Sequence, residues 1–275
     1  LILTGDGSAQ LLAKHQPVKF AAMENLYEGR THAPLVAVGI LSGDKNGHKQ
    51  KDFLMKIEIP NLLSLMAFRD AKAYVPGIRD LIHGNPDQHI LSVEEKMVRG
   101  KIAIAALKDF KDAQQEGNLA RADSARAVLD EHFAYFGYGH LTDIHQAIPP
   151  IPTTFYSFRI MVVLGMWFVL LFILSLIFVL RRKPVRWRGF LYAAVLSIPL
   201  AYLASEMGWL VAEFGRQPWV IQDLMPTSVA VSKITAGSVK LTFVLFAITF
   251  TLLLIADFKI LTHQIKLGPK DGGAN

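Results

Sequence analysis

Two carboxylates stand near the end of an apolar stretch in the second half of the chain. Glu206 and Glu213 are seven residues apart, about two helical turns, so a helix would place them on one face. An acid at membrane depth is costly and usually marks a proton path, an ion site or a cofactor ligand. The competing interpretation is a Glu213 at the membrane interface that is neutralised by the nearby Arg216.

Met161 lies at the start of another apolar stretch, two residues after Arg159. A thioether is a soft axial ligand for haem iron, and a neighbouring guanidinium can pair with the carboxylates of a haem. Most methionines in membrane segments only fill space, however, so this pattern alone favours packing over ligation.

A third group of polar residues lies near the beginning of the chain, around Lys19 and Glu24. These two could serve as hydrogen-bonding partner and proton acceptor for a small polar headgroup. Gln16 precedes them in the same segment, and Asp6 lies further upstream. A solvated charge pair on a short helix explains the same pattern and is the more common situation.

Histidine and cysteine suggest no metal site. The chain has no cysteine, which excludes disulfides, thiolate metal sites and cysteine catalysis. Its nine histidines form no HExxH or other close ligand pair. We interpret them as ordinary surface or loop residues.

The elements that must position these residues divide the chain in two. Residues 1–157 contain 17 Lys and Arg and 18 Asp and Glu, whereas residues 158–275 contain 12 and 5, giving net charges of −1 and +7. The basic half is the apolar half, and its charges cluster at the ends of hydrophobic stretches. This distribution is typical of a membrane protein and argues against a nucleic-acid partner.

Three apolar stretches are long enough to cross the ~30 Å core of a bilayer. The first, Ile160–Leu180, is 21 residues without a charge. We expect membrane helices at about 158–180, 189–213 and 235–258, followed by a cytoplasmic tail. The predicted fold class is an all-α membrane protein, with three transmembrane helices of a larger helical bundle and a mostly helical extracytoplasmic loop domain.

The connection 181–188 sets the expected orientation, because it holds five Lys and Arg and no acid. The positive-inside rule places it in the cytoplasm. Residues 5–157 and 214–234 then lie on the outer, periplasmic face, and the C-terminus is cytoplasmic. Residues 1–4 would be the end of a preceding membrane helix, so we expect the chain to be part of a longer polypeptide.

Residues 1–157 have the pattern of a folded domain. Ser92 and Glu95 fit a capping box before a helix that reaches about Gln115, with Ile102 in its apolar stripe. A second helix is expected from about Leu119 to Phe136, which gives a helical hairpin. Residues 27–56 favour loop or weak β structure, and residues 149–152, rich in proline, predict an extended connector into the first membrane helix.

Several of these motifs occur in a familiar order. Together they resemble the C-terminal portion of the large subunit, subunit I, of cytochrome bd-type ubiquinol oxidases. The most specific motif is Gly215-Arg216-Gln217-Pro218-Trp219. The others are Gly5-Asp6, Gln16-Pro17-x-Lys19-x-Ala21-Ala22-x-Glu24, Glu58-Ile59-Pro60, Phe158-Arg159-Ile160-Met161, Gly208-Trp209-x-x-x-Glu213 and Leu267-Gly268-Pro269.

The resemblance implies a quinol site in residues 1–157, which match the long form of the family's quinol-binding loop. Lys19 and Glu24 would bind and oxidise quinol, with Asp6 and Gln16 as supporting residues. Residues 158–275 would form the membrane domain, in the bacterial cytoplasmic (inner) membrane.

The resemblance also implies haem ligands. Met161 would bind the iron of a low-spin haem b, with Arg159 as a charge partner. Glu213 would bind the iron of a high-spin haem b, and Trp209 and Arg216 would line that site. The cofactors expected are two haem b and one haem d, or a third haem b in its place.

The activity implied is that of a terminal oxidase that oxidises quinol at the outer face and reduces oxygen to water, generating a proton-motive force without pumping. The expected partners are the N-terminal part of the same subunit, a smaller second subunit, possibly a short single-helix subunit, quinol, oxygen and the lipid bilayer. Activity would require the N-terminal helices and the second subunit, because the haem d ligand and the histidine opposite Met161 lie outside this chain. Glu206 also matches a family acid but receives no role.

Two other functions fit the topology. One is a membrane-anchored extracytoplasmic binding or sensor module. The other is a transporter fragment that uses Glu206 and Glu213 in proton coupling. Haem absorbance in membranes separates the oxidase from an anchored sensor, which should show none.

Overall fold

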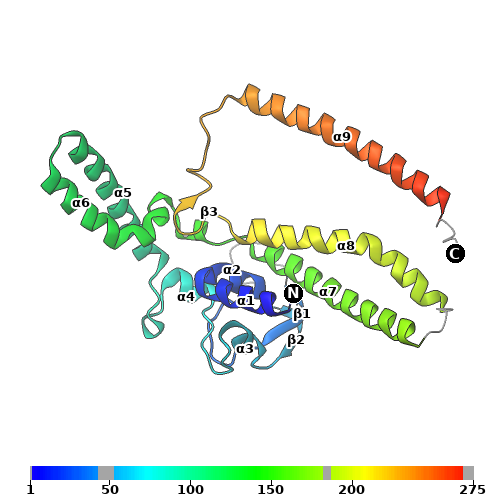
Figure 1. The fold of residues 1–275 in the computed structure, drawn as a ribbon. Coiled ribbons are helices and arrows are strands. Elements are labelled where there is room, and N and C mark those ends of the chain that lie inside the picture. The colour runs from blue at the N-terminus through cyan, green and yellow to red at the C-terminus, as the bar shows by residue number, and fades with distance from the viewer. Residues whose placement is uncertain (1, 43–52, 182–186, 269–275) are drawn as a thin grey trace. The chain divides into compact units, whose positions relative to one another are not determined.

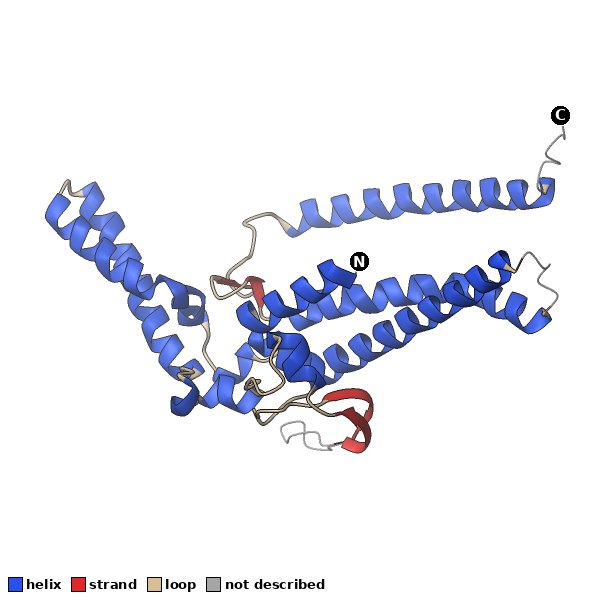
Figure 2. Ribbon diagram, turned by 60° about the horizontal axis from the view of Figure 1, so that its bottom comes forward, coloured by secondary structure: helices blue, strands red, loops and turns tan. Residues whose placement is uncertain are grey.

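The computed structural model describes residues 2–42, 53–181 and 187–268, and in these ranges it is mostly helical (Figures 1 and 2). Internal contacts divide the chain into two units, Leu1–Ala230 and Val231–Asn275. The first unit joins the N-terminal region to two long helices, so its contacts cross the predicted domain boundary at residue 157. The second unit contains α9 (Ala236–Leu267).

Three helices are long and apolar enough to cross a membrane: α7 (Ile151–Leu180), α8 (Arg188–Gly215) and α9. This confirms the predicted all-α membrane protein with three spans. Within the first unit, α7 and α8 lie side by side, and the indole N–H of Trp167 donates a hydrogen bond of 2.8 Å to the hydroxyl of Ser197. Residues 182–186 of the predicted cytoplasmic connection lie outside the described residues, as do Leu1 and the tail 269–275.

The helix ends differ from the predicted ones. Residues 149–152 were predicted to form an extended connector, but its last two residues are already helical. Helix α7 begins at Ile151 and has Pro152 in its first turn. Proline suits that position, because the first helical N–H groups have no partner within the helix. The last helix continues past Lys259 to Leu267 instead of ending near residue 258, because its last turns lack a breaker before Gly268.

Four short helices form the core of the N-terminal region: α1 (Ile2–His15), α2 (Pro17–Glu24), α3 (Leu62–Phe68) and α4 (Ile78–His83). Residues 1–4 were predicted to be the end of a membrane helix. The helix does not end there, because α1 continues to His15. The side chains buried between these helices include Phe20, Ala21, Ala22, Leu63, Val75, Ile78 and Leu81.

A β-hairpin occupies the region predicted as loop or weak β structure. Strand β1 (Leu35–Leu41) pairs antiparallel with β2 (Phe53–Ile59), with two register shifts, so strand pairing extends beyond the predicted end at residue 56. Residues 43–52 of this region lie outside the described part of the chain.

The predicted helical hairpin is confirmed, with α5 (Val93–Gln115), α6 (Leu119–His132) and Gly117 at φ +74° between them. The amide of Glu95 donates to the hydroxyl of Ser92 at 3.1 Å, as a capping box requires. The predicted apolar stripe is wrong at Ile102, which is exposed, while small residues such as Ala103 and Ala122 are buried. Small side chains let the backbones of neighbouring elements approach closely.

The second helix of this hairpin ends four residues earlier than predicted. A 3-10 segment follows it, η2 (Phe133–His140). Two further 3-10 segments are η1 (Pro86–Gln88) and η3 (Ile144–Ala147), and a small second sheet pairs β3 (Trp219–Ile221) with β4 (Met225–Pro226).

Phe155 joins the β-hairpin to α7. Its side chain is fully buried and meets the ring of Phe53 edge-on, with centroids 5.6 Å apart. Next to it, the hydroxyl of Tyr156 accepts a hydrogen bond of 2.9 Å from the amide of Leu41. The hairpin is therefore held at the start of the first membrane helix.

Replacing Phe155 with alanine should loosen this hairpin. Deleting a buried aromatic ring leaves a cavity and costs about 3–5 kcal/mol. Hydrogen exchange of the β1 amides, measured in the assembled membrane complex, should become faster. Phe133→Ala is the matched control, because Phe133 is about half exposed (49%). Equal exchange in the two variants would contradict the role given to Phe155.

Candidate functional site: an apolar cavity with a buried ion pair

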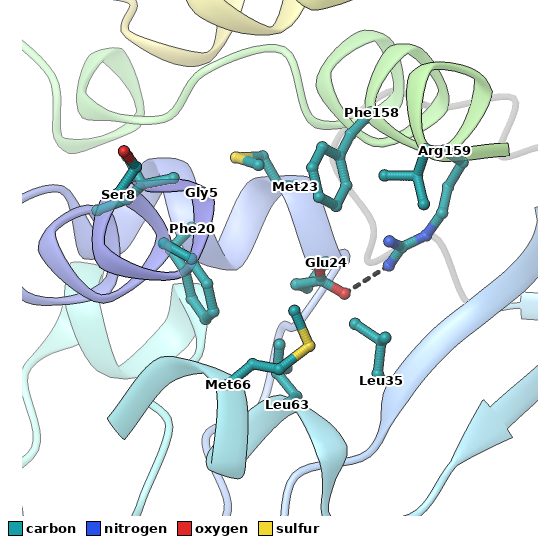
Figure 3. A pocket seen from close by; sticks show the side chains of 13 residues that line it. Gly5, Ser8, Phe20, Met23, Glu24, Leu35, Leu63, Met66, Phe158 and Arg159 are labelled. Carbon is teal, nitrogen blue, oxygen red and sulfur yellow. Dashed lines mark hydrogen bonds and ion pairs between the residues drawn. The ribbon is translucent and has the colours of Figure 1, made fainter. Parts of the chain in front are cut away.

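A cavity of about 290 Å³ lies between α1, α2, α3 and α7 (Figure 3). Its walls are mostly apolar, and Glu24 and Arg159 are the charged side chains among the described residues that line it. Other lining residues are Gly5, Ser8, Leu12, Phe20, Met23, Leu35, Leu63, Met66, Phe158 and Val162.

Glu24 and Arg159 form a buried ion pair in the wall of this cavity. One guanidinium nitrogen of Arg159 donates to the carboxylate of Glu24, and the two residues are only 8% and 5% exposed. The guanidinium also lies over the rings of Phe155 and Phe158, at 5.0 and 5.2 Å. Its Nε, also buried, has no hydrogen-bond partner among the described residues. The arrangement places an acid and a cation together in apolar surroundings.

Burial raises the pKa of Glu24 above the ordinary value of 4.5, although Arg159 opposes this shift by its charge and its hydrogen bond. The carboxylate therefore holds a proton more readily than an exposed glutamate. The folded pKa lies above the unfolded one, so the protonated form favours folding. The contribution of Glu24 to stability is complete below pH 4.5 and is lost as pH rises through the folded pKa.

The local fold explains why Glu24 faces the cavity. Pro17 occupies the first turn of α2, and Asn25, in the left-handed conformation at φ 52°, ends it. Glu24 is thus the last residue of the helix, and its side chain reaches Arg159 on α7.

Lys19 lies on a different face of α2, because five residues rotate the side chain direction by about 140°. Its ammonium donates a hydrogen bond of 3.4 Å to the carbonyl of Ala212 on α8. Burial lowers the pKa of Lys19, Arg216 lowers it further and Glu213 raises it. The structure therefore brings Lys19 to the end of α8, and Lys19 does not line the cavity that Glu24 lines.

Asp6 and Gln16 lie around the cavity without lining it. Asp6 accepts hydrogen bonds from Arg69, just after α3, and from Gln10 at 3.0 Å, and the hydrogen bond from Arg69 lowers its pKa. This pair connects two helices that form cavity walls. The backbone of Gln16 joins α1 to α2, since its amide donates to Leu12 and its carbonyl accepts from Phe20.

Met161 is half-buried and faces α8. A Cβ added at Gly208 would come within 3.2 Å of its sulfur, so a glycine at position 208 provides the space that the thioether occupies. Sequence spacing alone could not indicate this contact.

Glu213 pairs with Arg216 at 2.7 Å, and the two side chains are 35% and 45% exposed. This is the contact that the interfacial interpretation of Glu213 predicts. Trp209 (58% exposed) and Glu206 are also exposed on α8. A polar and aromatic surface on a membrane helix leaves room for a bound group or a further segment of protein.

The side chains of Met161 and Glu213 would fit a haem, which would supply electron-transfer chemistry there. The thioether of Met161 and the carboxylate of Glu213 are both accepted ligand types for iron. Among the residues that the structure describes, no group of three or more His, Cys, Asp and Glu is placed to hold a metal ion by itself. Each of the two residues would offer one donor atom to a haem iron.

The sequence pattern indicates neither the apolar lining of the cavity nor the partner of Arg159. Phe20, Met23 and Met66 carry no pattern that marks a site, and Glu24 is 135 positions from Arg159. An arginine beside an apolar span could have signalled a need for a buried carboxylate, but not which one.

Comparisons with known proteins agree on one family. The model of cytochrome bd terminal oxidase subunit I matches residues 1–269. The chain is 31% identical to cytochrome bd-II ubiquinol oxidase subunit 1 of Escherichia coli (strain K12), over 96% of this chain and 51% of that protein. It is 26% identical to cytochrome bd ubiquinol oxidase subunit 1 of Bacillus subtilis (strain 168), over 97% and 45%.

The solved structure of bd oxidase from Geobacillus thermodenitrificans is similar, with a TM-score of 0.57 and 25% identity, over 98% of this chain and 46% of that one. The chain thus spans about half the length of the curated relatives it matches.

Replacing Arg159 with glutamine should raise the pKa of Glu24 further, because the buried carboxylate loses its cation. Infrared spectroscopy should then show the carbonyl band of a protonated carboxyl at neutral pH, and Glu24→Gln in the same background should remove it. Arg69→Gln, which breaks the more exposed pair with Asp6, is the control and should add no such band. An Arg159→Gln spectrum without a band that depends on Glu24 would argue against the buried pair.

Proposed function

This chain belongs to the family of cytochrome bd terminal oxidase subunit I, and we propose that it is part of a respiratory oxidase that oxidises quinol and reduces oxygen to water. The observation that carries the proposal is the apolar cavity with Glu24 and Arg159 in its wall. Family membership also argues against the anchored sensor, which rested on topology, and against the transporter fragment, which rested on Glu206 and Glu213.

The proposed substrate of the cavity is a quinol. Its apolar walls suit an aromatic ring, and pockets that bind small molecules combine such walls with a few placed polar groups. Glu24 would accept the proton of a quinol hydroxyl, for which a raised pKa suits it. Arg159 would orient the carboxylate and stabilise its ionised form.

Asp6 and Gln16 remain supporting residues of the proposed quinol site. Lys19, which was expected to bind and oxidise quinol, takes a supporting role here because it does not line the cavity. Lys19 would act from the second face of α2, where it holds the end of α8. Asp6 would hold α1 against α3 through Arg69. Gln16 would fix the angle between α1 and α2.

Oxidation of a quinol to a quinone releases two electrons and two protons. We place this reaction at the outer face, where residues 5–157 and 214–234 are expected from the positive charge of residues 181–188. Protons released there and cytoplasmic protons consumed in oxygen reduction would generate a proton-motive force without pumping.

Met161 would hold a low-spin haem b, with Arg159 two residues away as charge partner, and Glu213 would hold a high-spin haem b beside Trp209 and Arg216. Bound haem supplies one-electron transfer and, with haem d or a third haem b, the oxygen-reducing centre. The other ligands and the oxygen site would come from the rest of the subunit. A smaller second subunit, alone or with a short single-helix subunit, would complete the enzyme.

Glu24→Gln should lower the kcat of quinol oxidation by ~10²-fold or more, because it removes the proton acceptor and keeps the shape of the side chain. Haem content of the assembled oxidase should not change. Glu28→Gln is the matched control, since Glu28 is exposed and paired with Arg79. A Glu24→Gln enzyme with the kcat of the control would contradict the proposed quinol chemistry. Lys19→Ala should weaken quinol oxidation and leave the haems in place.

Met161→Leu should remove the optical signal of the low-spin haem, because leucine has no donor atom. Glu213→Gln should alter only the high-spin signal. Met166→Leu, at an exposed position (69%) of the same helix, is the control and should leave both signals unchanged. A normal low-spin spectrum in Met161→Leu would refute the ligand assignment, and membranes without any haem absorbance would refute the proposed function.

A further inference from the structure

The turn that follows α8 packs against η2, the 3-10 segment that follows the helical hairpin. Trp219, at the start of β3, is 4% exposed, and its ring meets the ring of Tyr138 in η2 edge-on, with centroids 4.9 Å apart. The amide of Gly137 donates a hydrogen bond of 2.8 Å to the carbonyl of Asp223 in the turn between β3 and β4. Figure 1 shows β3 beside the segment that follows α6. The contacts join residues about eighty positions apart in the chain.

Three polar groups gather at this contact, of which Tyr138 is buried and Lys96 and Asp223 are partly buried. The phenol of Tyr138 interacts with the carboxylate of Asp223, which raises the pKa of the phenol. The ammonium of Lys96, on α5, lies 5.5 Å from the centre of the Tyr138 ring. Burial lowers the pKa of Lys96 and raises that of Tyr138, while Asp223 favours the charged form of the lysine and the neutral form of the tyrosine. A cation and a carboxylate thus lie close to one buried phenol.

Close backbone contacts leave no space for side chains here. A Cβ at Gly137 would lie 2.5 Å from the carbonyl oxygen of Asp223. A Cβ at Gly100, on α5, would lie 2.3 Å from the amide nitrogen of Gly139. Glycine therefore sets both the distance of η2 from α5 and the distance of the turn from η2. Asp223 itself has φ 58°, a left-handed conformation that aspartate tolerates better than most residues.

The same turn is connected to the proposed haem ligand. The amide of Trp219 donates a hydrogen bond of 2.8 Å to the carbonyl of Arg216. The guanidinium of Arg216 in turn donates to the carboxylate of Glu213 at 2.7 Å. Tyr138 thus reaches Glu213 through Trp219 and Arg216, each step a direct contact.

We propose that Tyr138, with Lys96 over its ring, is a positioning residue by which the helical hairpin holds the turn from Arg216 to Asp223 and so orients the Glu213–Arg216 pair. The inference rests on the proposed function for its effect on haem, but not for the contact itself. It gives residues 1–157 a role at the proposed high-spin haem of Glu213, besides their role at the quinol cavity.

The test uses the assembled oxidase in membranes, with Tyr138→Phe, Asp223→Asn and the double variant. Tyr138→Phe keeps the ring that packs against Trp219 and removes the hydroxyl that interacts with Asp223. Hydrogen exchange of the amides at 219–223 should become roughly tenfold faster. The double variant should be no worse than either single one, because all three lose the same interaction. Tyr135→Phe, in the same 3-10 segment, is the matched control and should exchange at the wild-type rate.

A second readout separates positioning from mere packing. The optical spectrum and reduction potential of the high-spin haem should shift in Tyr138→Phe, while the KM for quinol stays unchanged. Unaltered exchange at 219–223 would overturn the contact, and faster exchange with an unaltered high-spin haem would overturn the positioning role. If Glu213→Gln also leaves that haem unaltered, the ligand assignment of the proposed function has failed, and the exchange result still decides the contact.

Discussion

The buried pair of Glu24 and Arg159 is the interaction on which the arrangement of the first unit depends. Taking a carboxylate and a guanidinium out of water costs several kcal/mol each, and leaving either one alone there costs more than keeping both. The pair therefore requires α2 and α7 to meet at one place. That place is two residues before Met161 in α7 and directly in the wall of the cavity.

Helix α2 contacts α7 with one face and the end of α8 with another. Its last residue, Glu24, contacts α7, and Lys19 contacts the end of α8 beside Glu213 and Arg216. An eight-residue helix can do this because residues five positions apart point in different directions. A displacement of α2 would disturb its contacts with both α7 and α8. The proposed quinol cavity and the proposed haem ligands therefore share one structural support.

The helical hairpin provides a second support through close backbone packing. Its contacts with η2 and with the turn after α8 depend on glycine and alanine, and larger side chains such as Ile102 and Leu119 lie outside. Close packing of backbones defines a position more sharply than long, flexible side chains do. This explains why the buried face of the hairpin is made of small residues, contrary to the apolar stripe that the periodicity predicts.

Local features were predictable from the sequence by itself. Three apolar spans, the capping box at Ser92 and the hairpin break at Gly117 depend on neighbours within a few residues, and all three are present. The motifs around Glu24, Met161 and Glu213 also sufficed to identify the family, because each motif is a short, ordered set of residue types.

Only the tertiary structure decided which of these residues meet. The partner of Arg159 is 135 positions away, and Lys19 contacts α8 instead of the cavity. Tyr138 packs against Trp219, which follows the second span in the chain. Sequence periodicity defines the face on which a side chain lies, but not the element that the face will contact. That choice depends on how the whole chain buries its apolar surface while pairing the few charges that go with it.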